Sequence, residues 1–98
     1  MARSYNGLGS VYYSQSNYLK AIEYYEKALA IKLKALGAEH PDVAVSYNNL
    51  GSVYDSQGNN PKAIEYHEKA LAIRLKALGA EHPNTKFSQK VLSLCRNN

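Results

Sequence analysis

The sequence is short of several residue types, and each shortage excludes a class of protein. One cysteine, Cys95, excludes an intrachain disulfide and favours a reducing compartment, so we expect a cytoplasmic location. No apolar run approaches the roughly 18 residues that a membrane span requires, and the first residues lack the apolar stretch of a signal peptide. A chain of 98 residues has room for one domain. Disulfide-rich secreted scaffolds, membrane-spanning proteins and large multi-step enzymes are therefore not expected.

The sequence also contains no tryptophan and one phenylalanine against nine tyrosines, and this imbalance points to a short motif that is duplicated. Ser4–Tyr12 returns as Ser46–Tyr54, 42 residues later. Over the full offset, residues 4–45 and 46–87 are identical at 31 of 42 positions. A repeat of this length decides the fold, because each repeat is one structural unit that packs against the next.

Each repeat has the pattern of two helices. In residues 18–36, apolar side chains recur at i, i+3, i+4 and i+7, which is the spacing of one helix face. Gly37 and Gly79 follow the last apolar residues and favour helix ends, and a His-Pro pair follows each of them. We predict five helices, at residues 3–15, 18–36, 42–57, 60–78 and 84–95.

Gly51 lies inside one of these predicted helices, at a cost of about 1 kcal/mol relative to alanine. Such a glycine indicates that another helix approaches closely. Ala63 and Ala70 on the following helix are the small partners that we expect to face it.

The repeated residues resemble the tetratricopeptide repeat. The matching positions, in order and spacing, are Tyr5, Leu8, Gly9, Tyr12, Tyr18, Ala21, Tyr25 and Ala28, followed by Tyr47, Leu50, Gly51, Tyr54, Gly58, Ala63 and Ala70. The length of 42 residues, with Tyr-Asn-Asn-Leu-Gly and Leu-Gly-Ala-Glu-His-Pro, is similar to the kinesin-light-chain type of this repeat. The resemblance implies an all-α, antiparallel helix-pair solenoid forming a single domain over residues 1–98. It would hold a first repeat at 3–41, a second at 42–83 and a capping helix at 84–96.

The resemblance also implies a protein-interaction module that holds a peptide or a partner helix on a concave surface, lined by the first helix of each pair. The family's groove positions fall here on Arg3, Asn6, Ser10, Tyr13, Val45, Asn48, Asn49, Ser52, Asp55 and Lys90. Asn6 and Asn48 carry this interpretation, because amide side chains can bond a peptide backbone whatever its sequence. In kinesin-light-chain-like repeats such asparagines are the expected cargo contacts. The alternative is that both asparagines bridge neighbouring helices.

Most of the tyrosines have a structural interpretation. Those at core positions of the repeat pattern are expected to pack, namely Tyr5, Tyr12, Tyr47 and Tyr54. Tyr13 differs, because its counterpart in the second repeat is Asp55 and packing does not demand an aromatic there. We expect Tyr13 to be an interaction hot spot or a contact between chains.

We expect no catalysis, no cofactor and no metal site. His40 and His82 occupy equivalent turns 42 residues apart, so one metal ion is not expected to contact both. His67 takes an aromatic position of the repeat and is expected to pack, and Cys95 has no neighbouring base in sequence. A net charge of +4 leaves weak nucleic-acid binding as a remote alternative, which a steep salt dependence would reveal. The lysines alternate with glutamates, however, as they do on a solvated helix face.

A structural or assembly role is a further possibility, because repeats this similar indicate recent duplication or consensus engineering. We expect the N-terminal edge to be uncapped and able to join chains into a homo-oligomer. The first inter-helix turn has Ser16 and Leu19 where the second has Gly58 and Pro61. Without these two helix breakers, the helices of the first repeat could join into one and exchange between chains as a domain-swapped dimer.

Overall fold

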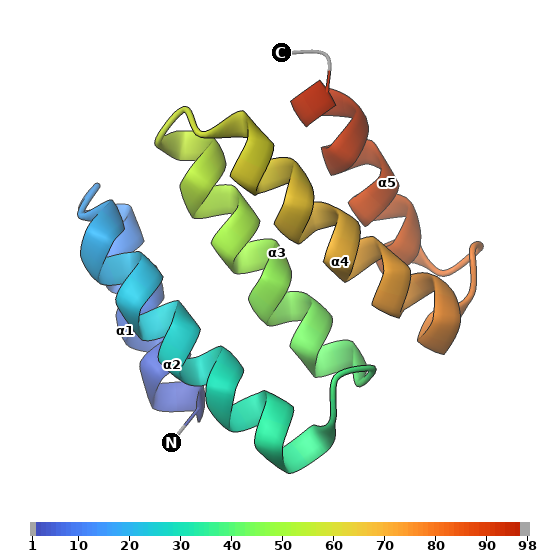
Figure 1. Cartoon of the computed structure of the whole chain (residues 1–98), viewed down its shortest axis with the longest axis horizontal. Coiled ribbons are helices and arrows are strands. Elements are labelled where there is room, and N and C mark those ends of the chain that lie inside the picture. Colours follow the sequence, from blue (N-terminus) through green and yellow to red (C-terminus); the bar gives the residue numbers. More distant parts are fainter. Residues whose placement is uncertain (1, 97–98) are drawn as a thin grey trace.

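The computed structural model describes the backbone of residues 2–96 and the side chains of residues 4–94. It contains five α-helices: α1 (Ala2–Ser14), α2 (Tyr18–Leu36), α3 (Pro41–Ser56), α4 (Asn60–Leu78) and α5 (Pro83–Arg96). Figure 1 shows them as antiparallel neighbours that follow one another in chain order. The predicted all-α solenoid, with two helix pairs and a fifth helix at the end, is confirmed. Among the described residues, no helix is long and apolar enough to cross a membrane.

Side chains in the turns explain where the helices begin. Asn17 and Asn59 each accept a hydrogen bond through Oδ1 from the backbone N–H three residues later, at 3.4 Å. His40 and His82 each accept one through Nδ1 from the backbone N–H two residues later, at 3.1 Å. The two histidines therefore act at helix starts, as expected of turn residues. The prolines that follow them are the first residues of α3 and α5, where a missing N–H costs nothing, so both helices begin one residue before their predicted bounds.

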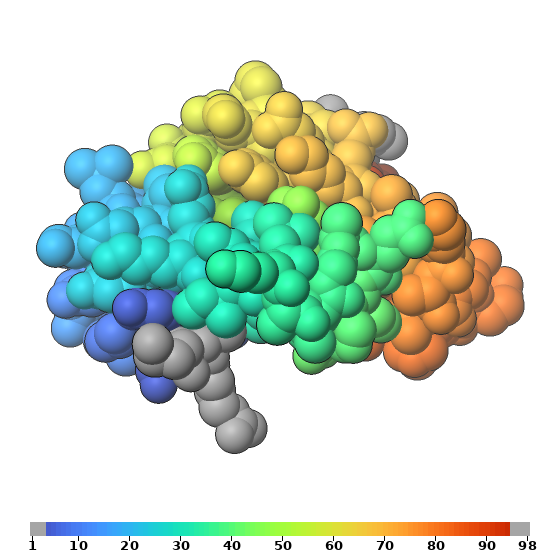
Figure 2. Space-filling view, turned by 60° about the horizontal axis from the view of Figure 1, so that its bottom comes forward, coloured from blue at the N-terminus to red at the C-terminus, as the bar shows by residue number. Residues whose placement is uncertain are grey.

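The core lies partly between the two helix pairs and partly within the second pair. One buried cluster joins α2 to α3 and consists of Ala21, Tyr25, Leu50 and Val53. A second joins α3 to α4, flanked by α2 side chains, and consists of Val43, Ala44, Ala70 and Ile73. In the space-filling view the colours run in chain order from α1 and α2 to the turn before α5, as expected of a solenoid (Figure 2). Burial between repeats fixes α1, α2 and α3 around the site described below.

Gly51 makes a close approach to α4, as predicted, but the predicted partners were wrong. A Cβ atom on Gly51 would lie 2.8 Å from the ring of His67. Ala63 and Ala70 lie one turn to either side of His67 on the same face of α4, and the longer side chain between them reaches the glycine first. The first repeat has the same arrangement, because a Cβ atom on Gly9 would lie 2.7 Å from the Tyr25 ring.

The tyrosines at repeat-core positions pack as expected, but at half-buried sites rather than in the core. Two three-ring stacks form, each centred on a tyrosine of the second helix in the repeat: Tyr5, Tyr24 and Tyr12, then Tyr47, Tyr66 and Tyr54. The centroid separations are 6.0 and 5.5 Å in the first stack, and 6.0 and 5.6 Å in the second. Lysine ammonium groups lie over both stacks. The rings therefore join the two helices of each repeat along a surface seam.

Candidate functional site

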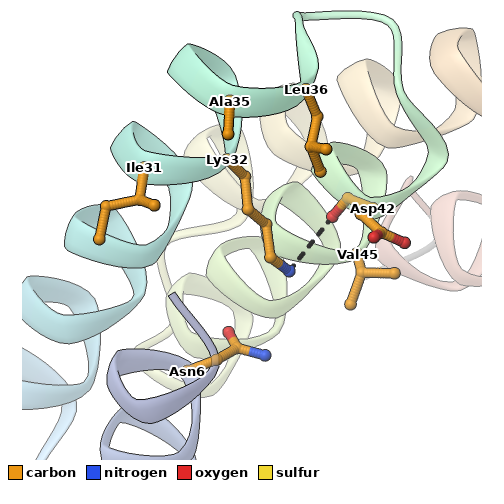
Figure 3. Close-up of a pocket in the computed structure, with 7 residues that line it drawn as sticks. All are labelled: Asn6, Ile31, Lys32, Ala35, Leu36, Asp42 and Val45. Atoms are coloured by element: carbon orange, nitrogen blue, oxygen red, sulfur yellow. Dashed lines mark hydrogen bonds between the residues drawn. The ribbon is translucent and has the colours of Figure 1, made fainter. Parts of the chain in front are cut away.

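A pocket of about 470 Å³ opens where α1, α2 and α3 meet. Its lining comes from all three helices and consists of Asn6, Ile31, Lys32, Ala35, Leu36, Asp42 and Val45. Figure 3 shows Ile31, Ala35 and Leu36 along α2, with Asn6 on α1 and Val45 on α3. The pocket thus lies between the first helices of consecutive repeats, and the second helix of the first repeat forms one wall.

Three polar residues, Asn6, Lys32 and Asp42, line this mainly apolar pocket, and the first two supply side-chain donors. The half-buried Lys32 spans it and places Nζ 3.4 Å from the backbone oxygen of Asp42, a long hydrogen bond (Figure 3). The Oδ1 atom of Asn6 accepts from Nδ2 of Asn49 at 3.3 Å, and this bond links α1 to α3. The Asn6 oxygen is therefore engaged, whereas its amide nitrogen can donate to a ligand. Apolar walls with a few polar groups that fix orientation are typical of ligand pockets.

The predicted groove residues divide into those at the pocket and those engaged elsewhere. Asn6 and Val45 line the pocket, and Asn49 holds Asn6. Asn48 instead pairs through Oδ1 with Nδ1 of His67 at 3.1 Å, which bridges α3 and α4. The alternative interpretation of the asparagines, that they join neighbouring helices, thus describes contacts that Asn48 and Asn6 both make.

The remaining predicted positions lie away from the pocket lining. The Ser10 hydroxyl bonds the Tyr25 hydroxyl at 2.9 Å, and the Tyr13 hydroxyl bonds Oγ of Ser56 at 2.7 Å. Further positions also lie outside that lining, namely the half-buried Ser52 and the exposed Asp55 and Lys90. The side chains of Arg3 and Cys95 lie outside the described residues.

Sequence reasoning missed the contribution of α2, whose side chains form much of the pocket: Ile31, Lys32, Ala35 and Leu36. One feature of the sequence could have indicated this site, namely the positions at which the two repeats differ. Three of the positions at which the repeats differ fall here, because Lys32, Asp42 and Val45 correspond to Arg74, Asn84 and Phe87. Where α4 meets α5, Arg74 is buried and donates to the Asn84 backbone oxygen at 3.3 Å and to Ser88 Oγ at 2.7 Å.

His67, which bonds Asn48, is a buried titratable group with 1% of its area exposed. Burial lowers the pKa of His67 below its ordinary value of 6.5; Asp55 opposes this effect, and the Arg74 guanidinium adds to it. Its Nε2 atom is buried without a hydrogen-bond partner in the described part of the chain. Within the same residues, no group of three or more His, Cys, Asp or Glu side chains is placed to hold a metal ion.

Comparison with known proteins identifies the family of the repeat. A model of the tetratricopeptide repeat matches residues 1–76. The chain belongs to the tetratricopeptide repeat (TPR) family. Among curated proteins, no sequence matches this TPR chain significantly.

Two solved structures support the kinesin-light-chain type of the repeat. One is the crystal structure of a Podosopora anserina protein, provisionally assigned as a kinesin light chain, with nearly identical TPR-like repeats; the other is a point variant of it. Each is 33% identical to the chain, with a TM-score of 0.83 over 97% of its length. The chain spans 45% of the length of either structure. TPR repeats generally serve as protein-interaction modules.

Proposed function

We propose that this TPR chain binds an extended peptide along α1 and α3, with one apolar side chain of the peptide held in the pocket. The observation that carries the proposal is the composition of the pocket. Its walls, Ile31, Leu36 and Val45, fit an aliphatic or aromatic side chain, while Lys32 and Asn6 offer donors at its edge.

The two donors favour a ligand that brings oxygen acceptors next to its apolar side chain. The Lys32 ammonium makes one long bond to a backbone oxygen, so a peptide carbonyl or carboxylate can replace that contact with a shorter one. The Asn6 amide nitrogen can donate to a peptide carbonyl in the same way. Tyr13 and Ser52 lie on the same two helices and would contact the flanking residues of a longer peptide.

The affinity that we expect is modest. Two repeats provide a short contact surface at the low end of specific interface sizes, so dissociation constants of about a micromolar or weaker are expected. Selection for binding should therefore enrich peptides that share one apolar anchor, rather than a long conserved motif.

An unbiased peptide-display selection on the folded chain tests the proposal. Enriched peptides would be screened again on Ala35→Trp, which fills the pocket, and on Ala77→Trp, which places the same side chain at the equivalent exposed position of the second repeat. We expect binding to be lost on Ala35→Trp and kept on Ala77→Trp. Lys32→Ala should weaken the same peptides several-fold, because it removes the donor but not the walls.

Peptides that bind the wild type and Ala35→Trp equally would show that the pocket is not the anchor site. Peptides lost on both tryptophan variants would indicate a general effect on folding, which circular dichroism of the two variants separates from a local one. Absence of enrichment on a folded sample would contradict the proposal.

A further inference from the structure

The outer face of α1 is exposed, although its counterpart in α3 is buried. Leu8 and Val11 are 41% and 52% exposed, whereas the equivalent Leu50 and Val53 are both 0% exposed. From residue 4 to residue 14, α1 differs from the matching part of α3 at two positions, Gly7 and Tyr13. The sequence of this face is therefore that of a buried interface, and the structure of the second repeat shows what covers it: the α2 helix.

The one other helix with this covering sequence is α4. It differs from α2 at four positions, where Asn60, Pro61, His67 and Arg74 replace the α2 residues. The α2 leucines that flank the contact with α3 and α4, Leu29 and Leu33, are Leu71 and Leu75 in α4. Leu75 is 41% exposed. The α4 helix therefore carries the surface that binds an α3-like helix, with part of it uncovered.

The helix that occupies this surface, α5, matches it less well than α1 does. Leu50 and Val53 of α3 lie in the buried cluster shared with α2, and α5 has Leu92 and Cys95 at the equivalent positions. At these positions α1 keeps Leu8 and Val11. Since apolar contact area drives such packing, α1 equals α5 at the leucine and offers the larger apolar side chain at the second position.

α1 also keeps the serine that a polar contact made by α4 requires. Arg74 donates to Oγ of Ser88 at 2.7 Å, and the residues equivalent to Ser88 are Ser46 and Ser4. Where α2 meets α3, Lys32 stands in place of Arg74, and the buried Oγ of Ser46 has no hydrogen-bond partner among the described residues. A helix with serine at this position therefore suits α4, and the exposed Ser4 supplies it.

We propose that the chain assembles head to tail: the exposed face of α1 docks on α4 of a second copy and displaces α5 from it. The two repeats of one copy then continue the solenoid of the other, with α1 and α2 in the places that α3 and α4 hold within a chain. Because donor and acceptor are different surfaces, the contact does not close on itself, and further copies can add. This surface is separate from the peptide pocket, so the inference stands or falls independently of the proposed function.

Sedimentation velocity of the full chain, over a series of concentrations, tests the assembly with two complementary variants. Leu8→Lys blocks the donor face and Leu75→Lys blocks the acceptor face, each at an exposed position that folding does not require to be apolar. We expect the mean mass of the wild type to rise steadily with concentration and each variant alone to remain monomeric. An equimolar mixture of the two should form pairs and nothing larger, because each variant keeps one working surface.

Leu94→Lys is the matched control, since it makes the same change at an exposed position of α5 outside both surfaces, and it should assemble as the wild type does. A wild type that stays monomeric throughout would overturn the proposal, as would a mixture that does not pair. Loss of assembly in Leu8→Lys alone would indicate a symmetric contact between two α1 helices. Assembly that survives in both variants would indicate helix exchange through the first turn; either result contradicts the head-to-tail arrangement.

Discussion

At the scale of single residues, two glycines in α1 have opposite environments. A Cβ atom at Gly7 would meet nothing within 4 Å, whereas at Gly9 it would lie 2.7 Å from the Tyr25 ring. We expect Gly7→Ala to stabilise the fold by up to about 1 kcal/mol through helix propensity. Gly9→Ala should destabilise it by roughly 1–3 kcal/mol, because the buried ring must move. Urea unfolding of the two variants measures both effects, and equal stabilisation by both would contradict this account of Gly9.

His67 makes stability depend on pH. Burial lowers its pKa in the folded chain, so below pH 6.5, the ordinary pKa, the unfolded chain binds more protons than the folded one. The contribution of His67 to stability is therefore fully present above that pH and is lost progressively as the pH falls from 6.5 towards the folded pKa.

The first repeat suggests the variant that removes this dependence. Tyr25, the counterpart of His67, bonds the Ser10 hydroxyl, and Ser52 stands at the equivalent place in the second repeat. His67→Tyr should therefore raise stability at acid pH and flatten the pH profile, as measured by urea midpoints on either side of pH 6.5. A profile as steep as that of the wild type would mean that other groups cause the loss.

The sequence predicts which residues pack against a neighbouring helix better than it predicts which side chain each of them contacts. Gly51, His67 and the repeat tyrosines stand at positions that the repeat pattern marks as contacts, so their packing followed from spacing. Which atom meets which depends on side-chain length. The ring of His67 therefore reaches Gly51 ahead of the alanines, and the tyrosines stack half-buried instead of filling the core.

At the scale of elements, the two inter-helix turns share one backbone shape with different residues. Ser16 has a φ of 62° and Gly58, its counterpart, a φ of 83°, both in the left-handed region. A residue with a Cβ atom pays about 1–2 kcal/mol there, which glycine avoids. Ser16→Gly should therefore stabilise the chain by about 1 kcal/mol and move any helix-exchanged dimer towards monomer.

Gly58→Ser is the matched control for this prediction, because it introduces the same strain at the second turn. It should lower stability by a similar amount, and urea unfolding with a light-scattering mass reports both quantities. If Ser16→Gly left stability unchanged, the first turn would not be strained in the way that its backbone indicates.

Helix bounds were also open to prediction at this scale, because Gly37, Gly79 and the His-Pro pairs act locally. The pocket was not. It needs α1, α2 and α3 together, and the contribution of Lys32 depends on where its long side chain crosses to α3. Periodicity assigns a face to such a residue but does not say which neighbouring helix it reaches.

At the scale of the whole molecule, stability should decline towards the helix that is least like the others. In a solenoid each unit is held by its immediate neighbours, and α5 packs chiefly on α4. The buried Thr85 stands where α3 has the buried Val43, and Ser88 is buried as its counterpart Ser46 is. Arg74 is central to the contact between α4 and α5, since it donates to Ser88 and to the Asn84 backbone oxygen, while its own backbone oxygen accepts from Thr85.

Arg74→Ala should therefore loosen α5 without unfolding the two repeats. Loss of the charged donor leaves Ser88 buried without that partner, at a cost of about 2 kcal/mol, which corresponds to roughly thirtyfold faster opening of α5. Hydrogen exchange of backbone amides should accelerate by that factor in α5 and change little in α1–α3. The control is Lys32→Ala, at the equivalent position between α2 and α3. It should accelerate hydrogen exchange less, because Lys32 is half-buried and makes one long bond. Equal acceleration along the whole chain after Arg74→Ala would mean that the repeats and α5 unfold as one cooperative unit, and displacement of α5 by a second copy would then be improbable.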